Sequence, residues 1–145
     1  MLKEFIKNQT AVSCIVLTGA AVGLIASIIF LINATTGWFA GQSVNIWIPL
    51  CSFTAIILAV CAVIFFDKIT QIADLCVMLA VILLGLSVTL FIVDRIDIFS
   101  EVWLIPIPNP DTQIAAVNTA AAGIIFYFIS IIALITASFS KKFIK

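Results

Sequence analysis

An unbroken apolar stretch at residues 75–93 limits most tightly how this chain can fold. It contains no charged residue and lies between two carboxylates, Asp74 and Asp94. At about 1.5 Å per residue, its roughly 19 residues make a helix about 28 Å long, close to the roughly 30 Å of a bilayer's hydrocarbon core. The stretch therefore predicts a membrane-crossing helix with one carboxylate near each interface.

Three further apolar stretches, residues 11–32, 48–66 and 114–139, have similar lengths. Hydrophobic residues make up 64% of the 145-residue chain and charged residues only 10%, against about 25% charged residues in soluble domains. Backbone groups in lipid must be paired within the chain, and continuous runs of this length favour helices over barrel strands. We predict an all-α integral membrane protein, a single membrane domain that folds as a bundle of four transmembrane helices.

Polar segments separate the apolar stretches and predict the orientation of the chain. They predict outer loops at residues 33–47 and 94–113 and a short inner loop at residues 67–74. Six lysines fall on the side of the termini and the inner loop, whereas Arg95 is the one basic residue on the other side. The positive-inside rule then predicts that both termini are cytoplasmic. We expect a multi-pass protein of the cell membrane, with the bacterial cytoplasmic membrane as its location.

Three carboxylates follow the third apolar stretch at helical spacing. If the helix continues beyond the bilayer, Asp94, Asp97 and Glu101 share one face, and Trp103 lies mainly on another. Such a face could hold a hard cation through oxygen ligands or receive a partner. The alternative is a solvated acidic face with Arg95 beside it.

Small residues recur at a spacing of four in several apolar stretches and predict close packing between helices. The clearest case is Gly19, Gly23 and Ser27, and Gly123 belongs to a similar series in the fourth stretch. Two interpretations stay open for the Gly19/Gly23/Ser27 face: packing within the bundle, or contact with another subunit.

None of the four apolar stretches contains a charged residue, so a proton relay or an ion-coupled transport cycle has no evident carrier. Asn33, Asn118 and Tyr127 are the strongest polar candidates. We expect Asn118 either to bond to another helix or to line an outer cavity, on the same side as Trp38 and Trp47.

The chain contains no histidine, and its four cysteines form no close pair of the CxxC type. Together with the missing catalytic motifs, this predicts no enzyme, no metal site and no cofactor, and the zero net charge predicts no nucleic-acid binding. We predict a non-catalytic accessory or assembly subunit that docks onto a larger membrane complex through its outer loop. The alternatives are a homo-oligomeric small channel or transporter with an acidic outer mouth, and a binder of an outer-leaflet lipid or small ligand. The expected partners are the lipid bilayer and either another protein or a second copy of the chain.

Overall fold

The computed structural model of the protein describes residues 2–65, 69–104 and 111–140, and of residues 2–10 the backbone alone. Four α-helices, α1 (Leu2–Thr35), α2 (Trp47–Phe65), α3 (Thr70–Leu104) and α4 (Asp111–Ser140), are joined in this order, with a short 3-10 helix, η1 (Gly37–Phe39), after α1. Several parts of the sequence lie outside the described residues. These are the proline-rich part of the predicted outer loop, most of the link between α2 and α3, and the lysines at positions 68, 141, 142 and 145.

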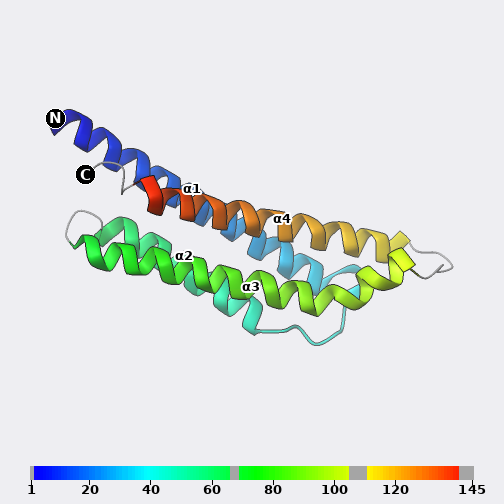
Figure 1. The fold of residues 1–145 in the computed structure, drawn as a ribbon. Helices are drawn as coiled ribbons and strands as arrows, with labels where there is room; N and C mark the ends of the chain where they lie inside the picture. The colour runs from blue at the N-terminus through cyan, green and yellow to red at the C-terminus, as the bar shows by residue number, and fades with distance from the viewer. Residues whose placement is uncertain (1, 66–68, 105–110, 141–145) are drawn as a thin grey trace.

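The four helices lie side by side as two pairs, α1 with α4 and α2 with α3 (Figure 1). The start of α1, the end of α2, the start of α3 and the end of α4 lie at one end of the bundle, which we call the terminal end. The turn after α1 lies toward the opposite end, which we call the outer end. All four helices are long and apolar enough to cross a membrane, and the described residues contain no strand. The prediction of an all-α bundle with four helices of spanning length is therefore confirmed for the described residues.

The helices are longer than the apolar stretches that predicted them, except for α2. α3 has 35 residues and continues through Leu104, so the predicted loop at residues 94–113 is helical in its first part. α1 likewise runs to Thr35 and takes in the start of the other predicted loop. Residues 94–104 contain neither glycine nor proline, the residues that most often end helices, so nothing in this sequence stops the helix at the membrane boundary.

Aromatic rings and small residues fill the centre of the bundle. Phe91 is fully buried and meets Phe30 and Tyr127 edge to face, with ring centroids 4.9 and 6.4 Å away. Such edge-to-face pairs are favourable beyond their area of contact. Ala55 and Ala59 of α2 are buried as well, so α2 approaches its neighbours through its smallest side chains.

The glycines of α1 and α4 lie where these two helices and α3 approach one another. A Cβ atom added to Gly19 would lie 3.2 Å from Leu134, and one added to Gly23 would lie 2.9 Å from the Ser130 hydroxyl. Gly19 and Gly23 therefore pack against α4 of the same chain, and Ser27 contacts Ser52 of α2 and Tyr127 of α4. This face is thus covered by helices of the same bundle.

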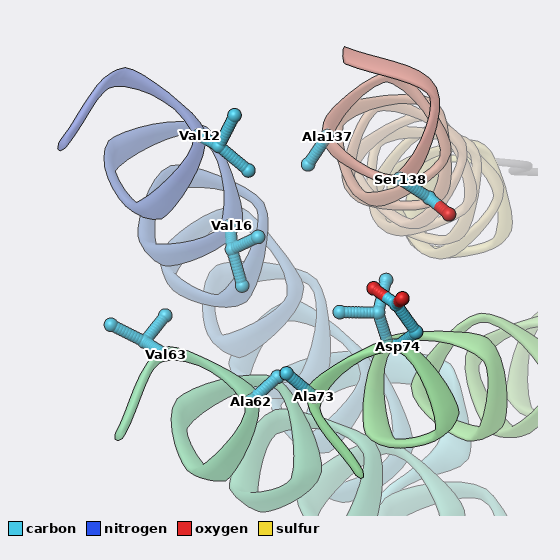
Figure 2. A pocket seen from close by; sticks show the side chains of 9 residues that line it. Val12, Val16, Ala62, Val63, Ala73, Asp74, Ala137 and Ser138 are labelled. Atoms are coloured by element: carbon cyan, nitrogen blue, oxygen red, sulfur yellow. The ribbon is translucent and has the colours of Figure 1, made fainter. Parts of the chain in front are cut away.

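A small cavity lies at the terminal end of the bundle. It holds about 10 Å³, room for about one water molecule. Figure 2 shows side chains from all four helices around it, with Val12 on α1, Ala62 on α2, the Asp74 carboxylate on α3 and Ala137 on α4. Most of the side chains that line this cavity are small and apolar.

We predict that Gly123→Ala destabilises the bundle. The added Cβ would lie 2.9 Å from the Phe91 ring and 3.1 Å from Ile29, and Phe91 is itself fully buried between two other rings. Overpacking of this kind costs about 1–3 kcal/mol, which we expect to see as a lower melting temperature in detergent. Gly85→Ala is the matched control, because no atom lies within 4 Å of its added Cβ. Equal melting temperatures for the two variants would contradict this packing.

Candidate functional site

The outer end of the bundle holds a buried arginine. The Arg95 side chain is 7% exposed, and its Nη1 atom lies 2.7 Å from Oδ2 of the neighbouring Asp94. Its Nε atom donates a hydrogen bond to Asn33 Oδ1 at 2.9 Å, and its guanidinium carbon lies 3.7 Å from the centroid of the Phe39 ring. A buried charge is tolerated only with such partners, and here α1, η1 and α3 supply them together.

Asn33 links this arginine to α4. Its Nδ2 atom donates to the Ala116 carbonyl at 2.8 Å, while its Oδ1 atom accepts from Arg95. A guanidinium offers only donors and a carbonyl only an acceptor, so the two partners fix which way the amide points. Because Asn33 is 3% exposed, this bridge lies inside the junction of three helices.

A second small core surrounds the bridge at the outer end. Phe39 of η1 and Ile98 of α3 pack there with Ala116 and Val117 of α4. The chain reaches this position through a turn in which Gly37 adopts a φ of 63°, a value that favours glycine. The turn brings Phe39 back onto Arg95 and supports the part of α3 that lies beyond it.

The three predicted carboxylates take different roles. Asp94 pairs with Arg95, Asp97 is exposed, and Glu101 is half-buried. In the part of the chain that the structure describes, no three histidine, cysteine or acidic residues are placed to hold a metal ion. The three carboxylates thus give this part of α3 an acidic character, and Asp94 is already paired with Arg95.

Arg95 is the main correction to the sequence analysis. It was expected beside a solvated acidic face, but it points into the bundle. The inward face of the α3 extension is formed by Arg95, Ile98 and, half-buried, Val102, whereas Trp103 is exposed. Arg95 and Ile98 continue the stripe of Leu84, Val88 and Phe91 at alternating spacings of four and three, so the helical period could have revealed the burial.

The residues predicted to line an outer cavity are on the surface. Trp38, Trp47 and Asn118 are all exposed, and none of them lines the groove described below. Asn118 makes no interhelical hydrogen bond within the described residues. At the tip of α3, by contrast, Trp103 and Leu104 are 77% and 79% exposed, the highest values among the exposed large apolar side chains of the described chain.

Hydroxyl groups between the helices are already satisfied. The Tyr127 hydroxyl lies 3.4 Å from the Ser27 hydroxyl, which lies 2.9 Å from that of Ser52. Ser130 donates to the Gly19 carbonyl, and Ser87 donates to the Ile48 carbonyl. Within the described residues no buried side-chain nitrogen or oxygen lacks a partner, so these groups tie helices together.

A groove opens beside Asn33 between the end of α1 and the start of α4. It holds about 150 Å³ and has no charged side chain in its lining. Its lining residues are Asn33, Thr36, Gly37, Thr112, Ala115, Ala116 and Thr119. We call it the outer groove.

The chain matches no protein-family model, no curated protein and no solved structure.

We predict that Asn33 and Arg95 are energetically coupled. Asn33→Leu leaves the Arg95 Nε donor and the Ala116 carbonyl without their partner, at a cost of about 1–3 kcal/mol. Combining it with Arg95→Met removes the stranded charge, so the double variant should be more stable than the sum of the two single effects by about 0.5–3 kcal/mol. Equilibrium unfolding in mixed detergent micelles measures this coupling. Asp97→Asn is the control, because Asp97 is exposed and lies two positions from Arg95, and it should leave the stability nearly unchanged. Strictly additive effects of Asn33→Leu and Arg95→Met on stability would contradict the bridge.

Proposed function

We propose that the protein is a non-catalytic accessory subunit of a larger membrane complex, and that it docks a protein partner on the outer end of α3. The observation that carries the proposal is the exposure of Trp103 and Leu104 at the tip of that helix. The position of these two residues relative to the bilayer and the charge around them indicate which kind of partner would cover them.

Arg95 provides a reference for the height of these residues. It is 21 positions from Asp74 on α3, which is about 32 Å along a helix and close to the thickness of a hydrocarbon core. Trp103 lies eight positions further, about 12 Å along the helix. A head-group layer adds only about 5–8 Å on each side. Trp103 and Leu104 would therefore lie above the head groups, where two large apolar side chains gain stability from a protein surface that covers them.

The charge at the outer end indicates the chemistry of the partner. Asp97 and Asp111 are exposed and Glu101 is half-buried, while Arg95 is engaged with Asp94. An apolar contact at Trp103 with carboxylates around it fits a partner surface that has an apolar pocket bordered by lysine or arginine. This is the arrangement in which a central tryptophan contributes most to binding.

The interior of one bundle favours a docking role over conduction. Between the cavity at the terminal end and the outer groove, the centre is filled by fully buried side chains: Phe30, Leu84, Phe91, Tyr127 and Leu134. A path for ions would have to form between several copies of the chain, and the Gly19/Gly23/Ser27 face that could have joined them is covered by α4.

We predict that a photo-reactive amino acid at position 104 forms a crosslink to one protein in intact cells. The same partner should be lost with Trp103→Ala, and Asp97→Lys should weaken its capture because the charge reversal repels a basic rim. Removing a central aromatic contact costs about 2 kcal/mol or more, which corresponds to a loss of affinity of about 30-fold. Mass spectrometry of the crosslinked product identifies the partner.

Leu86→Ala is the matched control for this experiment. Leu86 is 50% exposed on the membrane-spanning part of α3, away from the proposed docking surface. The variant should keep the crosslink. Crosslinks at position 104 that contain only lipid or only a second copy of the chain would overturn the proposal, and so would a captured protein that is insensitive to both Trp103→Ala and Asp97→Lys.

A further inference from the structure

The outer groove has a defined set of hydrogen-bonding groups. Thr36 donates its hydroxyl hydrogen to the Ile32 carbonyl at 2.6 Å, and Thr119 donates to the Ala115 carbonyl at 2.8 Å. Each of these hydroxyl oxygens keeps a lone pair that can accept. A ligand in the groove therefore meets two acceptors whose own hydrogens are already committed, and the hydroxyl of Thr112, which also lines the groove, can donate or accept.

Asn33 contributes the complementary donor. Its Nδ2 atom carries two hydrogens, and the described residues offer one acceptor for them, the Ala116 carbonyl. Arg95 holds Oδ1, so the amide cannot turn over to present its oxygen in place of the nitrogen. The second Nδ2 hydrogen, on a side chain that is 3% exposed, remains for a ligand acceptor.

These groups select a neutral ligand with hydroxyl groups. A hydroxyl both donates and accepts, so neighbouring hydroxyls can satisfy the threonine oxygens and the asparagine donor together. The groove has no cationic side chain to hold an anion, and Asp111 precedes the lining residue Thr112. Its volume of about 150 Å³ is many times that of the cavity at the terminal end, and it has room for a glycerol-sized group or one edge of a sugar ring.

The position of the groove favours a lipid as the source of these hydroxyls. Asn33 is bonded to Arg95, about 32 Å along α3 from Asp74, so the groove lies where lipid head groups begin. One helical turn deeper on the same face as Thr36, Ile32 is 49% exposed and offers an apolar surface beside which an acyl chain can lie.

We infer that the outer groove binds a neutral group with adjacent hydroxyls, which a glycolipid head group or a free sugar could supply. Thr36 and Thr119 accept from it, and Asn33 donates to it. The groups that would contact this ligand belong to α1 and α4, whereas Trp103 and Leu104 belong to α3, so the two proposals are tested by different variants.

The test uses the full chain in nanodiscs of phosphatidylcholine with and without monogalactosyl diacylglycerol. Native mass spectrometry should show one galactolipid retained per chain in preference to phosphatidylcholine, whose head group has no hydroxyl. Thr36→Val with Thr119→Val should lower this retention about tenfold, as expected for the loss of two hydrogen bonds. Ala115→Phe, which fills the groove and leaves the hydroxyls in place, should lower it as well.

Thr18→Val with Thr89→Val is the matched control, because these two exposed threonines make the same bond to the carbonyl four residues earlier and lie outside the groove. It should retain the lipid like the unaltered chain, and melting temperatures show that every variant is folded. Displacement of the lipid by free galactose, with the same loss in the groove variants, would support the site with a soluble source. Retention of galactolipid no better than phosphatidylcholine, or retention unchanged in both groove variants, would overturn the inference.

Discussion

The arrangement of the outer end depends on one buried charge. A guanidinium cannot enter the hydrocarbon core without great cost, and it cannot be buried in protein without partners. Arg95 is buried among such partners, Asn33, Asp94 and the Phe39 ring, and in the proposed placement it lies at the edge of the hydrocarbon core. Because Asn33 also binds the Ala116 carbonyl, the same contact sets the heights of α1, α3 and α4 relative to one another.

This bridge gives the outer end two different surfaces. On the α1 and α4 side, the fixed Asn33 amide borders a neutral groove with threonine hydroxyls. On the α3 side, the small core of Phe39, Ile98 and Val117 supports the helix beyond Arg95 and leaves its tip exposed. Deeper in the bundle the buried polar groups of the described residues have hydrogen-bond partners, and aromatic rings fill the centre. Recognition is therefore expected at the outer end, through the groove for small hydroxyl groups and through α3 for protein.

The length and hydropathy of the apolar stretches were enough to predict four helices, because spanning a bilayer requires about 20 apolar residues whatever they contact. Side-chain contacts were harder to predict. Arg95 follows Asp94 directly, which is typical of a solvated boundary, and its distant partner Asn33 can be seen only once α1 and α3 are placed together. Phe39 was missed because it lies in a segment with the composition of a loop, and its burial depends on the backbone turn at Gly37. The contact between Gly23 and Ser130 likewise depends on which helices are neighbours in the tertiary fold, and the sequence alone does not show this.

The most direct test of this arrangement asks whether the two ends of α3 lie on opposite sides of a membrane. In the full chain with its four cysteines replaced by alanine, single cysteines at the exposed positions Gln71 and Asp97 would be exposed to a membrane-impermeant thiol reagent in intact cells. If α3 crosses the membrane as proposed, Asp97→Cys is labelled from outside and Gln71→Cys is labelled only after the membrane is permeabilised. Labelling of both positions from the same side would contradict the crossing of α3 and the placement of Arg95 at the outer boundary.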